Sequence, residues 1–460
     1  FNRKRLSDAG LILLAAGTGL SSCQIGKSYT RPDMPLPARL DTLTQDTASI
    51  GDLSWWELYN DTTLQQLIHR ALTYNKDLKI ASARMNELAA LKRIDFANMF
   101  PQATARLNGN RETTNYGGDN FDADPELSLT ASISWELDLW GNLRWARDHS
   151  TAGFLASVEN CRAVKMGLVA QVAQSYFELM ALDNELAIVR RTLEARREGV
   201  RLAEIRFKGG LTSEIVFQQA KVELAKTATM VPDLERRISL KESEIALLTG
   251  DFPYAVNRNV LPEEIQLPDA LPLGLPSTLL ERRPDIRKAE RELMAAHAEV
   301  GLAYTNMFPR LALTATLGAE SETLRDLLKS PYSYLAGNLL SPLFAMGKNR
   351  AALKAKRAAY EGAVAEYEKT VLTAFKETHN AIINFNKIKD IYESRRQLAE
   401  ASRTAVELAQ LQYINGVIGY LDLLDAQRNY FDAQVSLSNA VCDKQLMIIN
   451  LYKALGGGWK

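Results

Sequence analysis

The chain has 460 residues, and its 55 Lys and Arg balance 55 Asp and Glu, so its formal net charge is zero. This balance weighs against a nucleic-acid-binding protein, which needs a basic excess to meet phosphate groups. Hydrophobic residues make up 46% of the chain, yet no apolar run reaches the roughly 18 residues of a membrane-spanning helix, which excludes a polytopic helical membrane protein. Three cysteines and four scattered histidines suggest neither a disulfide scaffold nor a metal site, so no metal or cofactor is expected.

Residues 1–22 have the layout of an export signal. The positive stretch Arg3–Arg5 precedes a short apolar core, Leu11–Leu20, which is too short to span a bilayer. Leu20-Ser21-Ser22-Cys23 then resembles a bacterial lipoprotein processing box, in which the cysteine thiol is acylated and becomes the new N-terminus. We therefore predict that Cys23 is the lipid attachment site; the alternative is a plain signal followed by a chance cysteine.

Residues 23–60 are predicted to form an extended segment behind this anchor. The stretch contains Pro32, Pro35 and Pro37 among polar residues. Proline fixes φ and removes a backbone donor, so a helix is not expected here. We interpret the segment as a tether laid over the protein surface.

The remainder of the chain contains an internal repeat. Asn98–Pro101 recurs as Asn306–Pro309, and single glycines and alanines further on match at nearly the same spacing. The sequence predicts a first repeat over 61–250 and a second over 278–456. Residues 251–277 hold five prolines and are predicted to be a linker.

Each repeat is predicted to run helix, two strands, long helix, shorter helix. The first helix is expected from Asp61, an N-cap residue, to Asn98. Its counterpart is expected to open near Ser277, with Pro284 close to its first turn.

Strands are predicted where apolar and polar residues alternate. Leu127–Leu139 alternates strictly, and Leu311–Leu317 does so in the second repeat. Weaker partner strands are expected near 102–111 and 334–344. The connections around 115–125 and 320–331 are polar and are predicted to be loops.

Two very long helices decide the predicted architecture. No proline occurs from Asn142 to Lys208 or from Lys348 to Asn415. At 1.5 Å per residue each helix would be roughly 100 Å long. Such helices must pack lengthwise against similar helices, as coiled coils do.

The strands are long enough to cross a bilayer when tilted. Four strands do not close a barrel, and open strand edges are intolerable in lipid, where no water satisfies the backbone. If the strands lie in a membrane, two chains would supply eight strands and three chains twelve. A half-buried soluble sheet is the alternative reading of the same alternation.

Several short stretches are distinctive when taken together: Trp55-Trp56, Glu136–Gly141, Arg282–Ile286, Phe308-Pro309, Ser341–Phe344 and Gly416–Arg428. Through these motifs the chain, from about Trp55 to Gly456, resembles the TolC-like outer membrane efflux proteins, and among them the lipidated exit ducts of resistance-nodulation-division (RND) pumps. The resemblance implies a homotrimer with one shared twelve-stranded barrel in the outer membrane and a long helical barrel through the periplasm. It also implies a periplasmic adaptor and an inner-membrane pump as partners.

Glycine-containing turns are predicted to end the two long helices. Gly209-Gly210 follows the first and Asn415-Gly416 the second, and glycine at these places is a C-cap signal. We expect these turns to form the periplasmic tip, where an adaptor would make contact.

A gate is predicted just after the second turn. Asp422, Asp425 and Arg428 are spaced i, i+3 and i+6, so they lie on roughly one helical face. In the family, matching positions hold the tip closed, which makes these three and Tyr413 candidate gate residues through salt bridges or hydrogen bonds. The first repeat departs from the family pattern. The two positions concerned are Val216, where the family often has an acid, and Glu214, a candidate substitute.

The leading functional hypothesis is a passive export duct in the outer membrane of a Gram-negative bacterium. Its energy would come from the pump, so no enzyme activity is expected. Alternatives are a structural coiled-coil lipoprotein of the cell envelope and the exit duct of a type I secretion system. A secreted enzyme is disfavoured, because no acid sits in a recognisable catalytic loop or metal motif.

Overall fold

The computed structural model describes residues 24–35, 52, 54–58, 61–114, 122–259, 276–342 and 344–459. The predicted export signal, Cys23 and residues 260–275 of the predicted linker lie outside these residues. The chain divides into two compact units. The first holds Arg84–Val158, Lys288–Lys369 and the N-terminal residues to Met34, and the second holds Pro35–Ala83, Glu159–Arg287 and Thr370–Lys460.

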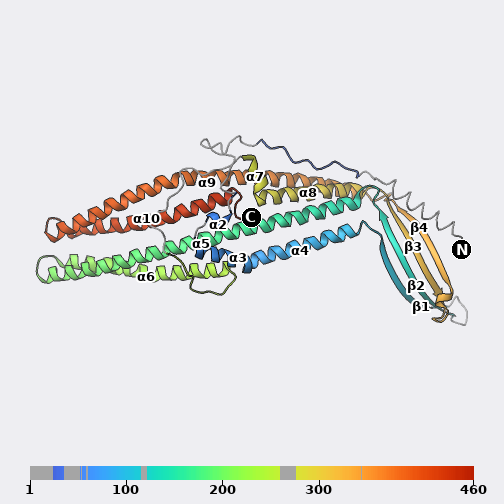
Figure 1. The fold of residues 1–460 in the computed structure, drawn as a ribbon, viewed down its shortest axis with the longest axis horizontal. Helices are drawn as coiled ribbons and strands as arrows, with labels where there is room; N and C mark the ends of the chain where they lie inside the picture. Colours follow the sequence, from blue (N-terminus) through green and yellow to red (C-terminus); the bar gives the residue numbers. More distant parts are fainter. Residues whose placement is uncertain are drawn as a thin grey trace. The chain divides into compact units, whose positions relative to one another are not determined.

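The first unit contains one four-stranded sheet in the order β1-β2-β3-β4, and every neighbouring pair is antiparallel (Figure 1). All four strands predicted from alternation are present. Strand β2 starts earlier than expected, because its register with β1 continues into the stretch predicted as a loop. The bounds are β1 Gln102–Thr114, β2 Asp122–Leu137, β3 Arg310–Ser321 and β4 Pro331–Leu340.

One face of this sheet is apolar across all four strands. The register sets Leu107 opposite Leu129, Ile133 opposite Ala315, and Leu311 opposite Leu339. Residues directly opposite in an antiparallel pair share a face, so the four separate alternations combine. This apolar face is open in the single chain, where Leu317 is 68% and Leu335 81% exposed.

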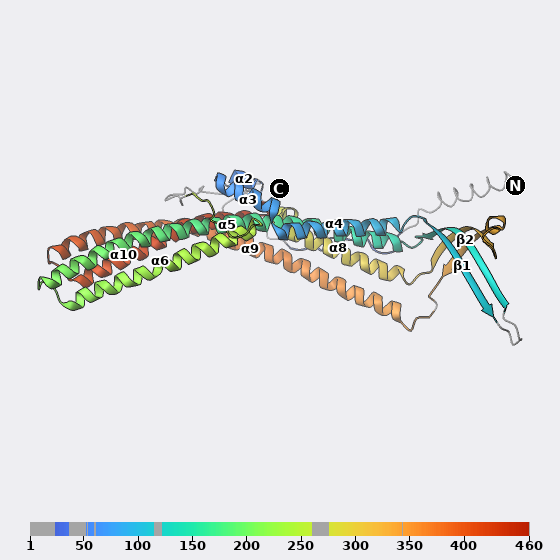
Figure 2. The same ribbon diagram turned by 90° about the horizontal axis from the view of Figure 1, so that it is seen from below.

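The helices repeat in matched lengths. The two long helices, α5 (Asn142–Lys208) and α9 (Lys348–Ile414), each have 67 residues, which confirms the prediction. The shorter helices, α6 (Glu214–Leu248) and α10 (Tyr420–Ala454), each have 35. In both views the α5–α6 and α9–α10 hairpins of the second unit lie side by side (Figure 2).

The prediction of a single helix over 61–98 is wrong, because the helix is interrupted at Asn75. Helix α3 (Thr62–Tyr74) ends there and α4 (Lys76–Ala97) begins. The buried Asn75 side chain donates to the carbonyl oxygen of Leu248 (3.0 Å) and accepts from the backbone N–H of Leu78 (2.9 Å). A tertiary bond and a local cap thus fix a kink that helix propensity does not reveal. The predicted N-cap, Asp61, is confirmed, since its carboxylate accepts from Thr63 and Leu64.

The second repeat is broken in the same way. Helix α7 (Pro276–Arg282) is followed by α8 (Pro284–Thr305), so Pro284 opens a new helix and does not lie in the first turn of a single one. Proline suits this first position, where its missing N–H would have no helical partner. The buried Arg283 between the two helices pairs with Asp285 and Glu377 (2.6 Å each).

The main core lies in the second unit. Tyr176, Leu179 and Val189 of α5, Ile245 of α6 and Ile449 of α10 are fully buried within one apolar cluster. Short helices α2 (Trp55–Leu58) and α3 pack onto it, Trp55 included. Within the described ranges, every helix is too short or too polar to cross a lipid bilayer.

Candidate functional site

The turns that end the long helices have the predicted capped geometry. Gly210 and Gly416 have φ of +70° and +74°, in the left-handed region that glycine adopts without a steric penalty. The N–H of Leu211 donates to the carbonyl of Arg206 (2.8 Å), and that of Val417 to Gln412 (2.9 Å). These are bonds of the Schellman type, which satisfy carbonyls at the helix end.

The predicted gate residues Asp422 and Asp425 are both exposed on α10. Asp422 accepts from the backbone N–H of Gly419 (3.0 Å) and so caps the helix. Asp425 accepts from the side chain of Asn429 (3.2 Å). Within one chain these two acids therefore make local bonds, and no direct hydrogen bond joins them to Tyr413 in the described residues.

Arg428 reaches across to α6, where it pairs with Glu223. The buried Glu223 also accepts from Arg196 of α5 (2.6 Å) and contacts Lys226 (3.3 Å). One carboxylate thus ties α5, α6 and α10 together. Arg428 was predicted from the sequence as a gate residue, but its partner Glu223 was not.

The electrostatics of this cluster favour a charged Glu223. The hydrogen bond from Arg428 lowers the pKa of Glu223 to about 2, against an ordinary value of 4.5, although burial opposes the shift. Lys226 and Arg196 add to the lowering. Removing one partner of such a cluster leaves a buried charge uncompensated, which is strongly destabilising.

A sequence signal for Glu223 existed. Ala220, Glu223 and Thr227 recur at i, i+3 and i+7 on α6, and all three are buried. That is the spacing of a helix–helix seam. A carboxylate at a seam position requires a cation from a neighbouring helix, and this requirement points to Arg196 and Arg428.

Tyr413, the fourth gate candidate, is buried at the end of α9. Its ring lies 5.7 Å from that of Tyr420 and 4.7 Å from the guanidinium of Arg206. Arg206 also donates to the backbone carbonyl of Tyr413 (3.3 Å). The hydroxyl of Tyr413 is buried without a hydrogen-bond partner among the described residues.

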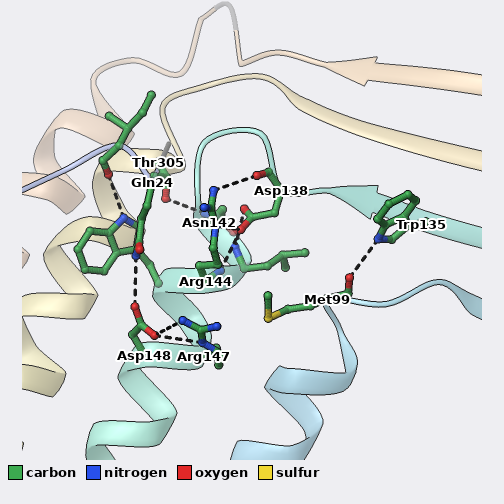
Figure 3. Close-up of polar contacts among 12 residues, drawn as sticks. Gln24, Met99, Trp135, Asp138, Asn142, Arg144, Arg147, Asp148 and Thr305 are labelled. Carbon is green, nitrogen blue, oxygen red and sulfur yellow. Dashed lines mark hydrogen bonds and ion pairs between the residues drawn. The ribbon is translucent and has the colours of Figure 1, made fainter. Parts of the chain in front are cut away.

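The junction of β2 with α5 is closed by polar bonds (Figure 3). Asp138 accepts from the backbone N–H of Leu143 (3.0 Å) and Arg144 (3.1 Å) and pairs with the Arg144 side chain (2.9 Å). Asn142 donates to Thr305 (3.0 Å) of α8. The Asp138 carboxylate is therefore the cap that starts the 67-residue helix α5 beside the sheet.

The N-terminal segment is bound at this same junction. Gln24 donates to Asp148 (3.3 Å), Ile25 bonds to the backbone of Trp140, and the indole of Trp145 donates to the carbonyl of Ile25 (3.0 Å) (Figure 3). Further along, Arg31 makes a bidentate pair with Glu290 (2.6 and 2.7 Å). The residues directly after Cys23 are thus fixed at the sheet end of α5.

No group of three or more His, Cys, Asp or Glu side chains in the described part of the chain is placed to hold a metal ion. The free thiols of Cys161 and Cys442 lie on α5 and α10. Cys442 is buried, and burial raises the pKa of its thiol to about 12. It therefore behaves as a packed apolar residue.

Comparison with known proteins gives consistent matches along the whole chain. Outer membrane protein OprJ of Pseudomonas aeruginosa is 31% identical over 466 residues, covering 98% of this chain and 96% of OprJ. The probable outer membrane lipoprotein SilC of Salmonella typhimurium is 28% identical over 468 residues, covering 100% and 99%. The solved structure of the outer-membrane channel OprN is 30% identical with a TM-score of 0.87, covering 95% of this chain and all of that one.

The family model described as outer membrane efflux protein matches residues 67–251 and 275–457, which is most of the chain. It covers both sets of helices and strands described above. This family consists of channels and not of enzymes, as the sequence analysis predicted. The chain belongs to the outer membrane efflux protein family.

Proposed function

We propose that this efflux channel works as a homotrimer whose three sheets join into one twelve-stranded barrel in the outer membrane. Small molecules would pass passively from an inner-membrane pump, along the helical part in the periplasm, to the outside. One observation carries the proposal: the sheet has an exposed apolar face on all four strands, and its two edges, β1 and β4, pair with no further strand in the described part of the chain.

Lipid tolerates apolar side chains but not backbone N–H and C=O groups that lack a hydrogen-bond partner. Strand β1 of one copy pairing with β4 of the next would satisfy both edges. Three copies of four strands reach a closed barrel with no edge left. Polar side chains on the other face, such as Ser132 and Thr316 (2.8 Å apart), then line the passage.

Exposed apolar residues at both helix turns support contact with a periplasmic adaptor. Leu211 is 73% and Val417 71% exposed, and Ile215 and Leu421 follow one turn further on. Small apolar patches held on a rigid turn favour a protein–protein contact. The shape of this patch is set by the turn residues Gly209, Gly210, Asn415 and Gly416. An RND-type pump in the inner membrane would bind the adaptor in turn.

The gate would lie just beyond these turns. Arg428 joins α10 to Glu223 of α6, so opening the tip would require this pair to break or to move as one body. Asp422 and Asp425 remain exposed for contact with a neighbouring copy, and Tyr413 packs against Tyr420 and Leu423 of the same helix α10. These four residues are our candidates for the periplasmic gate.

Lipid anchoring at Cys23 is part of the proposal. Gln24 and Ile25 are fixed beside the sheet, which supports acyl chains entering the same membrane as the strands. Replacing Cys23 with Ala should abolish incorporation of labelled palmitate, while trimers still form because the barrel also holds the protein. Undiminished labelling of the variant would contradict the anchor.

The decisive experiment is single-channel recording of the detergent-purified protein in planar bilayers, together with imaging of the particle. A three-fold particle with steady conductance is expected. A structural lipoprotein would give no conductance and would stay soluble without lipid or detergent. A type I secretion duct would also conduct, but its deletion would abolish secretion of a protein and would not sensitise cells to toxic small molecules.

A further inference from the structure

A cavity of about 610 Å³ in the first unit lies between the N-terminal segment and helices α5, α8 and α9. Its floor is aromatic: the ring of His297 lies 5.6 Å from that of Trp145 and 5.7 Å from that of Tyr360, both edge-on. Ile25 and Gly26 form another wall. The cavity therefore begins within a few residues of Cys23.

Two cations line this cavity, and two more lie near it along α9. Lys27 and Arg357 line it, and Arg350 and Lys354 continue from Arg357 along α9 at helical spacing. All four are exposed, and none makes an ion pair within the part of the chain that the structure describes. This basic stripe of Lys27, Arg350, Lys354 and Arg357 is charged and uncompensated.

The equivalent start of α5 lacks such a stripe. Its two arginines, Arg144 and Arg147, pair with Asp138 (2.9 Å) and Asp148 (2.7 Å). Residues 348–357 at the start of α9 instead hold five basic residues and no acid. Among the described residues, Lys356 alone of these five has an ion-pair partner, Glu299 (2.7 Å). The excess positive charge is thus specific to one of two otherwise matched helix starts.

Exposed apolar residues lie immediately before the stripe. Phe344 is 83% and Met346 86% exposed in the connection from β4 to α9, and Leu339, on the apolar face near the end of β4, is 67% exposed. A surface that sets free cations next to exposed apolar side chains complements an anionic lipid, with its charged headgroup and apolar chains.

We propose that the basic stripe and the aromatic cavity bind the phosphate headgroup of an anionic phospholipid, whose acyl chains lie along Leu339, Phe344 and Met346. The inference rests on the proposed outer-membrane location of the sheet. A free phosphate would account for the cations but not for the three exposed apolar residues. The bound lipid would fix the anchor segment and the start of α9 at the membrane surface.

Native mass spectrometry of the full-length, detergent-purified protein tests this. Dioleoyl phosphatidylglycerol and dioleoyl phosphatidylcholine, which share their acyl chains, are added in equal amounts. Each Lys or Arg near an anionic surface contributes about 1 kcal/mol, or roughly fivefold in affinity. The double variant Lys27→Ala/Arg357→Ala should therefore lose phosphatidylglycerol binding by about 25-fold and keep its weak phosphatidylcholine binding.

The matched control is Arg191→Ala/Lys376→Ala, which removes two exposed cations without ion pairs in the described part of the second unit. It should retain the lipid preference. Equal retention of both lipids by the parent protein, or an unchanged preference in the Lys27/Arg357 variant, would overturn the proposal. So would full displacement of phosphatidylglycerol by inorganic phosphate.

Two further measurements keep the test independent of folding and of the duct itself. Should the double variant melt at a lower temperature than the parent protein, Lys27→Glu alone, on an exposed segment, should still reduce the preference for phosphatidylglycerol. Conductance is recorded on the same preparations. A conducting protein without lipid preference refutes this inference alone, whereas a lipid-selective protein without conductance refutes the duct proposal.

Discussion

The two strand–helix junctions occupy equivalent places in the two repeats and share a backbone turn. Gly141 before α5 and Gly347 before α9 have φ of +84° and +78°. Yet a Cβ added at Gly141 would collide with Gln24, whereas a Cβ added at Gly347 would meet no other atom of the described residues within 4 Å, its chain neighbours aside. The first junction is covered by the N-terminal segment, and the second is open.

The side chains at matched positions differ accordingly. Asp138 caps α5, while the equivalent Phe344 is exposed. The same divergence separates the shorter helices, where Glu223 of α6 is buried in an ion cluster and the equivalent Asn429 of α10 is exposed. The two repeats share the same turns, because glycine adopts their positive φ without a steric penalty. Their side chains differ where the two repeats meet different neighbours.

Substitutions in the shorter helices should give the largest difference in stability between the two repeats. Glu223→Ala leaves Arg196 buried without its carboxylate, and loss of one partner from a buried pair costs about 3–5 kcal/mol. Asn429→Ala, the matched control, should change stability by no more than about 0.5 kcal/mol. Thermal unfolding of the detergent-purified protein, followed by circular dichroism, measures both. Similar melting temperatures for the two variants would contradict the role of Glu223.

The same cluster predicts a pH dependence. The pKa of Glu223 is lowered from 4.5 to about 2 in the folded chain. Its contribution, roughly 3 kcal/mol at 1.36 kcal/mol per pKa unit, is present above pH 4.5 and is lost as the pH falls toward 2. Melting temperatures between pH 5 and pH 2 should fall more steeply for the parent protein than for Glu223→Gln. Parallel curves would show that Glu223 does not titrate in this window.

The two repeats meet in the sheet, where β2 pairs with β3. A charge placed on either face of this sheet tests which face meets lipid. Leu317→Arg sets a charge on the apolar face, which costs about 2–4 kcal/mol per chain at the middle of a bilayer. Thr316→Arg, one residue away, sets the same charge on the polar face. Fractionation of cell membranes should find only the Thr316 variant at normal levels in the outer membrane. Equal recovery of both would contradict a lipid-facing sheet.

The smallest expected effect on stability comes from substitutions at the two strand–helix junctions. Asp138→Ala removes the cap of α5 and should lower stability by about 0.5–2 kcal/mol. Phe344→Ala, at the matched and exposed position, should leave the melting temperature in detergent unchanged. A comparable loss in both variants would show that the open junction is also packed.

Much of the fold could be predicted from the sequence, because its signals are local and repeated. The bounds of α5 were predicted correctly, since a proline-free run of helix formers ends at a glycine turn. The break at Asn75 was missed, because its cause is a hydrogen bond to Leu248, far away in the chain. Among the candidate site residues, the turn glycines and Arg428 were recognised, but Glu223 was not, since its importance depends on two helices distant in sequence.

By itself, the sequence determined the periodicities: helices of a given length, strands with one apolar side, and two copies of each. These follow from backbone geometry and side-chain spacing within short stretches. Only the tertiary structure decided which strand faces align, which cation meets Glu223, and which helix start keeps its charges free. These outcomes depend on residues that packing brings together from distant parts of the chain. The energies of such pairs therefore leave no pattern within one segment of the sequence.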